Sequence, residues 1–136
     1  MTRKTLLRIA AALCLVTCLG HTVGTFMPIP DEQVAMKETV SIMERTMIPM
    51  PVGSPRSSMQ ILDGNNLCTS LLLLMLGAWL LTMAAAAKNA ITDRSVAIAA
   101  FALAGFAVIS AAYFFPLPVV FTGLASALSF LALRRS

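Results

Sequence analysis

Charged residues are scarce in this sequence. They make up 12% of its 136 residues, and hydrophobic residues make up 58%, whereas a soluble domain carries about 25% charged residues. So little charge leaves too few polar side chains to cover a surface that faces water. The net charge of +4 is divided among short clusters beside apolar runs and forms no basic face, which argues against nucleic-acid binding.

Intramembrane carboxylates, paired cysteines and catalytic motifs are also missing. No Asp or Glu interrupts the long apolar runs, which argues against a carboxylate-driven proton or ion transporter. Three cysteines, Cys14, Cys18 and Cys68, have no paired spacing and form no disulfide framework. The sequence has no phosphate-binding loop, HExxH or GxSxG motif. An enzyme is therefore the less favoured class, although a membrane-lipid enzyme that uses His21 and Tyr113 stays open.

Long apolar runs dominate the rest of the chain. Residues 67–87, 96–115 and 117–133 form runs of 21, 20 and 17 residues without a charge. As helices they measure roughly 32, 30 and 26 Å, against a hydrocarbon core of about 30 Å. We predict an all-α fold, a single membrane domain over residues 1–136 with four transmembrane helices at about 7–27, 66–87, 96–115 and 117–133.

The first of these spans has two interpretations. A basic cluster precedes an apolar stretch at residues 9–27, in which His21 is the one ionisable residue. The same pattern describes a signal peptide that is cleaved after Gly20. Cys18 is unusual three positions before such a cleavage site, and we favour a retained helix.

Lysine and arginine residues predict the orientation. With four helices and the N-terminus inside, seven of them lie on the inner side: Arg3, Lys4, Arg8, Lys88, Arg94, Arg134 and Arg135. Lys37, Arg45 and Arg56 lie outside. Because cytoplasmic loops carry the excess of positive residues, we predict a multi-pass protein of the bacterial inner membrane with both termini in the cytoplasm.

The segment between the first two spans is more polar and is broken by prolines. Between Pro30 and Pro49 there is room for one helix, at about residues 30–48. Its apolar stripe consists of Met36, Val40, Met43 and Met47. We predict an amphipathic helix that lies on the outer membrane surface or caps the bundle. A loop at residues 50–60 follows, and Asp63, Asn65 and Asn66 are expected to cap the second membrane helix.

Polar residues at similar depths suggest one candidate site. His21 in the first span, Thr122 in the fourth and Ser110 in the third lie roughly 4.5 to 7 Å outward of their span centres, with Tyr113 further out. Trp79 falls near the bilayer centre, where it packs in the bundle or lines an apolar pocket. The candidate ligand-binding set is His21, Ser110, Tyr113, Thr122 and Trp79. The alternative is a neutral His21 that hydrogen-bonds a hydroxyl or a carbonyl.

Sulfur-containing residues suggest a metal. Thioethers select Cu(I), and Met43, Met47 and Met50 lie close together on the outer side, with His21 as a further ligand. Cys14 and Cys18 share a helix face with His21 and offer soft ligands for Cu(I) or zinc. Against both hypotheses, methionine and cysteine also serve as adaptable apolar residues.

The last two spans must form a tight hairpin, since one proline, Pro116, separates their apolar runs. Small residues at Ala100, Ala104, Gly123 and Ala127 allow close packing there. The same surfaces are compatible with a homo-oligomer or with a membrane-protein partner.

Short motifs carry a family resemblance. They are Gly20-His21, Met27-Pro28, Met50-Pro51, Gly64-Asn65 and Phe114-Phe115-Pro116. In size and layout the chain resembles small four-helix proteins of the bacterial inner membrane, broadly DoxX-like. The resemblance implies a membrane bundle, in some cases beside a redox partner, and no catalytic residue carries over. We therefore expect a non-enzymatic accessory subunit or a bundle that binds lipid or quinone; the alternative is a periplasm-facing metal or redox protein with copper.

Overall fold

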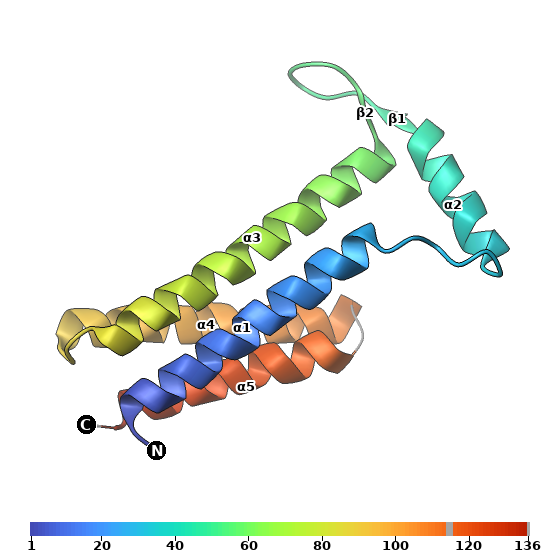
Figure 1. Cartoon of the computed structure of the whole chain (residues 1–136). Coiled ribbons are helices and arrows are strands. Elements are labelled where there is room, and N and C mark those ends of the chain that lie inside the picture. The colour runs from blue at the N-terminus through green and yellow to red at the C-terminus, as the bar shows by residue number, and fades with distance from the viewer. Residues whose placement is uncertain (114–115, 136) are drawn as a thin grey trace. The chain divides into compact units, whose positions relative to one another are not determined.

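The structure is a computed structural model that describes residues 1–113 and 116–135, with the side chain of Tyr113 outside the described part. The elements, in order, are α1 (Arg3–Phe26), α2 (Val34–Arg45), β1 (Met47–Ile48), β2 (Arg56–Ser57), α3 (Ser58–Ala85), α4 (Ala90–Tyr113) and α5 (Pro116–Leu133) (Figure 1). The chain divides into two compact units. We call Met1–Leu19 with Leu71–Ser136 the bundle unit and Gly20–Ser70 the insert unit.

Four helices, α1, α3, α4 and α5, are long and apolar enough to cross a membrane. This confirms the all-α fold and the four candidate membrane-spanning helices predicted from the sequence. In each of them no more than 33% of the most apolar stretch is buried inside the protein. The outward faces of these helices are therefore largely apolar as well, as their composition requires.

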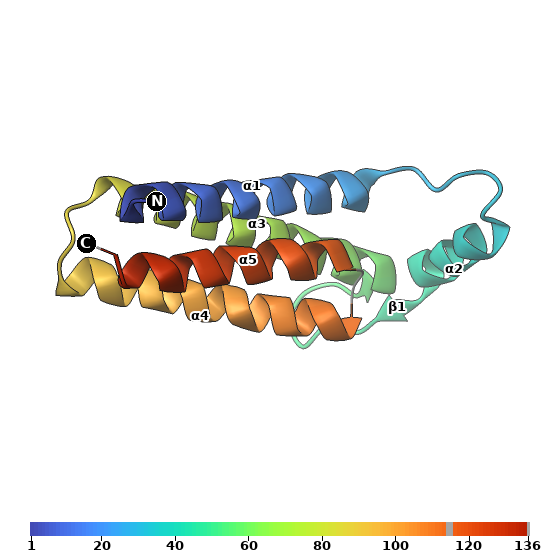
Figure 2. The same cartoon turned by 90° about the horizontal axis from the view of Figure 1, so that it is seen from below.

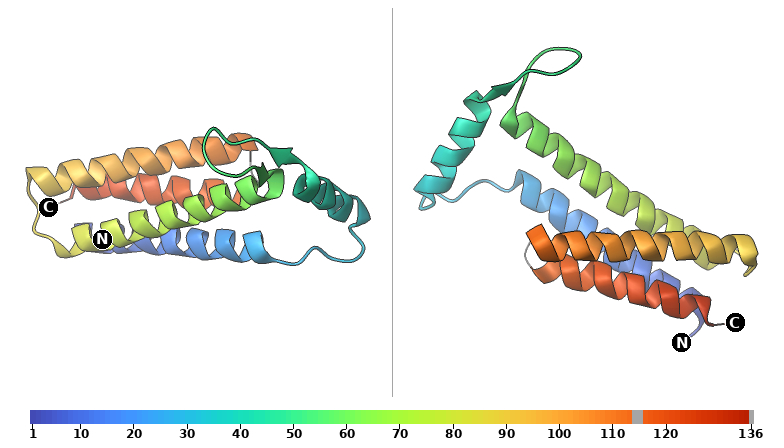
Figure 3. Two further views of the ribbon diagram at one scale, coloured as in Figure 1. Left: turned by 90° about the horizontal axis from the view of Figure 1, so that it is seen from above. Right: turned by 180° about the vertical axis from the view of Figure 1, so that it is seen from behind.

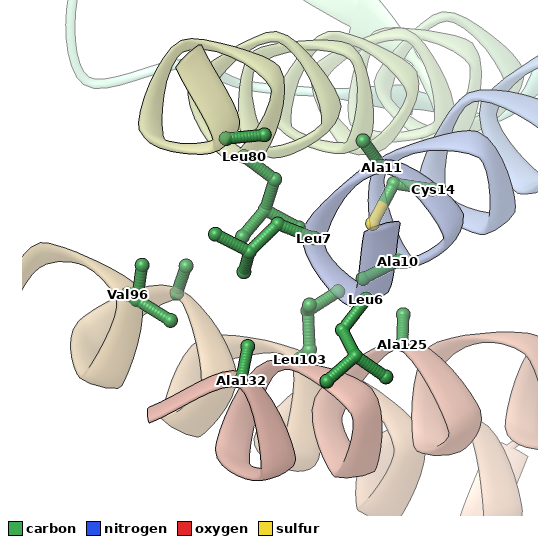
Figure 4. Packing of buried hydrophobic residues seen from close by; sticks show 12 residues of the cluster. Leu6, Leu7, Ala10, Ala11, Cys14, Leu80, Val96, Leu103, Ala125 and Ala132 are labelled. Carbon is green, nitrogen blue, oxygen red and sulfur yellow. The ribbon is translucent and has the colours of Figure 1, made fainter. Parts of the chain in front are cut away.

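The core of the bundle unit combines residues from all four long helices. The first half of α1 supplies Leu6, Leu7, Ala10, Ala11 and Cys14, which are almost completely buried (Figure 4). They pack in one cluster with Leu80 of α3, Leu103 of α4 and Ala125 and Ala132 of α5. Alanines at these positions let helix backbones approach closely, so α1 is an integral part of this core.

Helices α4 and α5 run antiparallel, side by side (Figure 2). The Ser126 hydroxyl donates a hydrogen bond of 2.8 Å to the carbonyl oxygen of Ala100 on the facing helix. Phe101 and Phe130 meet edge to face, with ring centroids 5.0 Å apart. Of the four small residues expected at this contact, Ala100 is buried, Ala104 and Gly123 are half-buried and Ala127 is exposed. Ser126, which precedes Ala127, makes the hydrogen bond to α4.

Both chain ends and the α3–α4 connection lie at the same end of the bundle unit (Figure 3). The Arg3 guanidinium donates to the carbonyl oxygen of Met83, in the last turn of α3, at 3.3 Å. It also pairs with Asp93, in the first turn of α4, at 3.4 Å. Lys88 donates to the carbonyl oxygen of Arg135 at 2.8 Å. We call this the basic end, because the seven bases assigned to the inner side belong to segments that meet here.

The insert unit contains α2 and a two-stranded antiparallel ribbon. Met47 pairs with Ser57 and Ile48 with Arg56, and the connecting turn contains Gly53 at a φ of 90°, a conformation that favours glycine. Asp31 and Lys37 form an exposed ion pair. The Thr22 hydroxyl of α1 donates to the Ser70 hydroxyl of α3 at 2.9 Å, which joins these two helices within this unit.

Helix α3 begins at Ser58, well before the expected start at residue 66. The Ser57 hydroxyl accepts from the Gln60 backbone N–H at 3.1 Å, and the Gln60 side chain accepts from the Ser57 N–H at 3.0 Å. This reciprocal capping box satisfies the first orphan donors of the helix. The prediction that Asp63, Asn65 and Asn66 cap this helix is therefore wrong, since all three lie inside it.

Helix α2 is shorter than the predicted segment at residues 30–48. It ends at Arg45 because Met47 and Ile48 form strand β1. Along the predicted apolar stripe, Val40 and Met43 are half-buried, whereas Met36 and Met47 are exposed. A helix is thus present in this segment, and its amphipathic role at a membrane surface stays a prediction.

Candidate functional site

A groove of about 280 Å³ lies between α3 and α4 in the bundle unit. Its lining residues are spaced as one face of each helix, at i, i+3, i+4 and i+7 on α3 and at i, i+3 and i+4 on α4. They are Leu72, Met75, Leu76, Trp79, Ser95, Ile98 and Ala99. Six of these seven are apolar, so the groove suits an apolar ligand.

The groove opens outward and not into the core. Trp79 is 52% exposed and Ile98 71% exposed, while Ala99 at its floor is 2% exposed. Trp79 is the one tryptophan of the chain. A large half-exposed aromatic side chain beside a recess gives an apolar ligand a wall to contact from the side. Trp79 thus borders an apolar recess, and its role in binding a ligand stays a prediction.

Polar groups approach this groove at the end nearest the basic end. Ser95 lines it directly, and the exposed Arg94 precedes Ser95 on α4. Arg94 and Ile98 are four residues apart, which places them on the same side of the helix. The neighbouring carboxylate of Asp93 is paired with Arg3, whereas Arg94 forms no ion pair with any described residue.

The structure places only two members of the predicted polar site, Ser110 and Thr122, in the same unit. Ser110 and Thr122 both belong to the bundle unit, and each is 1% exposed. The Thr122 hydroxyl donates to the carbonyl oxygen of Pro118 at 2.6 Å, one turn earlier in its own helix. That bond is ordinary for a buried threonine in a helix and supports a packing role.

His21 belongs to the insert unit, so its predicted meeting with Ser110 and Thr122 stays a prediction. The side chain of Tyr113, the fourth member of that set, lies outside the described residues. Helix α1 holds His21 in its last turns, and the backbone carbonyl of His21 accepts from the Thr25 hydroxyl at 2.9 Å.

The predicted metal ligands lie on different elements of the insert unit. Met43 is in α2, Met47 in β1 and Met50 in the turn that follows. Met43 and Met50 are half-buried, and Met47 is exposed. In the described part of the chain, no three His, Cys, Asp or Glu side chains are grouped so as to hold a metal ion, and this includes Cys14, Cys18 and His21. The copper hypothesis, which rests on thioethers, stays a prediction.

Of the residues that line the groove, the sequence analysis singles out Trp79 alone. The spacing of Leu72, Met75, Leu76 and Trp79 was available as a signal. In an apolar run, however, every face of the helix shows such a stripe, so the spacing alone selects none of them. Ser95 beside Arg94 was a second signal, a hydroxyl next to a base at the start of a span.

Comparison of this chain with protein-family models, with curated proteins and with solved structures finds no match. The resemblance to DoxX-like proteins therefore stays a prediction, and the candidate site is argued from its own geometry.

Proposed function

We propose that this protein is a multi-pass protein of the bacterial inner membrane whose four-helix bundle binds an apolar ligand, a lipid or a quinone, without catalysing a reaction. The observation that carries the proposal is the apolar groove at Trp79, on the outward face of helices that are apolar all round. Soluble proteins rarely expose apolar patches beyond a few hundred Å². A bilayer removes that penalty and delivers apolar ligands to the groove from the side.

The packing of α1 supports its retention in the mature protein. Leu6, Leu7 and Ala10 are at most 1% exposed within the common core. Without this helix the core would lose the residues that pack against Leu80 and Leu103, and these two side chains would become exposed. Between helices in a bilayer the stabilisation comes from close packing and not from removal of apolar surface from water, and the buried contacts of α1 provide such packing.

The clustering of bases supports an orientation, since the basic end carries seven bases and one acid, Asp93. We propose that this end is cytoplasmic, in line with the positive-inside rule. The insert unit, with the other three bases, then lies on the periplasmic side.

Cysteine labelling tests this arrangement. In a variant with Cys14, Cys18 and Cys68 changed to alanine, Val52→Cys is expected to react with a membrane-impermeant maleimide in intact spheroplasts, because Val52 is 91% exposed in the ribbon turn. Thr2→Cys is expected to react only after permeabilisation. The opposite pattern would overturn the orientation, and a mature chain that lacks the Thr2→Cys label altogether would show that α1 is cleaved.

Ligand retention tests the groove. Protein purified in mild detergent is expected to carry a lipid or quinone that mass spectrometry of an organic extract identifies. Trp79→Ala is expected to lower its retention about tenfold, the effect of losing part of a large apolar contact. Phe26→Ala is the matched control, since Phe26 is an aromatic residue that is 65% exposed at the end of α1 and does not line the groove. Equal retention in both variants would contradict the assignment of the groove.

A further inference from the structure

A base is the chain neighbour of the one polar residue that lines the groove at Trp79. Arg94 is exposed and lies on the same side of α4 as Ile98. The preceding residue, Asp93, forms an ion pair with Arg3 and not with Arg94. Its neighbour Ser95 is the one polar residue among the described residues that line the groove. A ligand that fills the apolar recess and continues toward the basic end would therefore meet a hydroxyl and then a guanidinium.

The depth of the groove in a bilayer follows from its place along α3. Trp79 and Leu72 precede Ala85, the last residue of α3, by six and thirteen residues. At 1.5 Å per residue the α3 wall runs from about 9 to about 20 Å below the basic end. A leaflet contributes roughly half of a hydrocarbon core of about 30 Å. The α3 wall therefore begins in the half of the core nearest the basic end and continues past its centre, so an acyl chain that enters from the basic end reaches Trp79 before Leu72.

The charge of this end favours an anionic head group. Lys88 and Arg94 flank the start of α4, and Arg134 and Arg135 follow the end of α5. The one acid, Asp93, is held by Arg3. Arginine binds phosphate oxygens through paired N–H donors, and basic residues at a membrane surface attract anionic lipid.

We infer that the groove holds one acyl chain of an anionic phospholipid and that Arg94 contacts its phosphate. This inference rests on the proposed function and specifies the chemical class of its ligand. The acyl chain packs along Leu72, Met75, Leu76 and Trp79 on one side and against Ile98 and Ala99 on the other. Ser95 lies between the chain and the head group.

Fluorescence quenching of Trp79 measures this binding directly, because it is the one tryptophan of the chain. The protein is reconstituted in vesicles of phosphatidylcholine and phosphatidylglycerol in which the acyl chains of one lipid or the other are brominated. The quenching ratio gives the relative affinity of the groove for the two head groups. We expect phosphatidylglycerol to be preferred about fivefold, which corresponds to about 1 kcal/mol.

Arg94→Gln is expected to bring this ratio close to one, and Arg94→Lys to keep most of the preference because it keeps the charge. Arg8→Gln is the matched control. It removes the same charge from an exposed residue of the basic end that does not line the groove, and its ratio is expected to stay near that of the unchanged protein.

Different outcomes separate the two proposals. Equal quenching by both brominated lipids, unaffected by Arg94→Gln, would overturn the anionic ligand and leave the apolar groove in place. Stronger quenching by a neutral quinone analogue, without a preference for phosphatidylglycerol, would do the same. No quenching of Trp79 by either brominated lipid would show that the groove does not face acyl chains, and the proposed function would fail with it.

Discussion

Replacing Gly77 with leucine is expected to destabilise the bundle by about 3 kcal/mol, near the upper range for overpacking. Gly77 lies where α3 passes α1. A Cβ atom at this position would lie 2.9 Å from Leu15 Cδ2, 3.0 Å from Leu15 Cγ and 3.3 Å from the carbonyl oxygen of Ala11. The Leu15 side chain can turn aside, but the backbone carbonyl cannot. Alanine is therefore expected to be partly tolerated, and leucine to force the two helices apart.

Cys14 reports this separation, because its side chain is fully buried one residue before Leu15. With Cys18 and Cys68 changed to alanine, the maleimide labelling of Cys14 in detergent is expected to accelerate by about two orders of magnitude in the Gly77→Leu variant. Gly105→Leu is the control, since no atom lies within 4 Å of a Cβ at that position. If both variants label Cys14 at the same rate, the close approach of α1 and α3 is refuted.

Replacing Arg3 with methionine has the second-largest expected effect, a loss of about 2 kcal/mol. The guanidinium joins the start of α1 to Asp93 of α4 and to the Met83 carbonyl of α3. Removing one member of a fully buried pair costs about 3–5 kcal/mol. The Asp93 side chain is 33% exposed while that of Arg3 is 8% exposed, so water replaces part of the lost contact and the expected loss is smaller.

Thermal unfolding in mild detergent, followed by circular dichroism, measures this effect in a double-mutant cycle with Asp93→Asn. A coupling energy of about 1 kcal/mol between the two positions is expected. Arg8→Met removes the same charge from an exposed residue of the same helix and is expected to change stability by less than about 0.5 kcal/mol. Arg3→Met and Arg8→Met variants of equal stability would argue that the pair adds nothing to the bundle.

The sequence predicts the long helices well because length and apolar composition alone determine them. The three runs after residue 66 end within about two residues of helix ends in the structure, at Ala85, Tyr113 and Leu133. The start of α3 differs from the expected one because the polar run from Asp63 to Asn66 has the composition of a loop but is helical in the structure. The Ser57-Ser58-Met59-Gln60 stretch carries the capping signal that places the start correctly.

The groove could not be predicted in the same way. Depth along each helix follows from counting residues, but which faces meet depends on the rotation of each helix about its axis. Six of the seven groove residues are apolar like their neighbours. The sequence therefore does not indicate which face of each helix points toward the other helix. Gly77 shows the same limit: a glycine in an apolar helix suggests a close approach, but only the packing identifies Leu15 and Ala11 as the residues it meets.

The place of α1 in the core has a consequence for biosynthesis. Leu7 packs in one cluster with Ala132, and 125 residues separate them in the chain. At ribosomal rates of about 5–20 residues per second, the first helix waits roughly 6 to 25 s before its last core partner is made. Within that interval α3 and α4 are made first, so Leu80, Asp93 and Leu103 become available to α1 before Ala132 does. Completion of the bundle is therefore the final event of synthesis, when the last helix to be translated packs against the first.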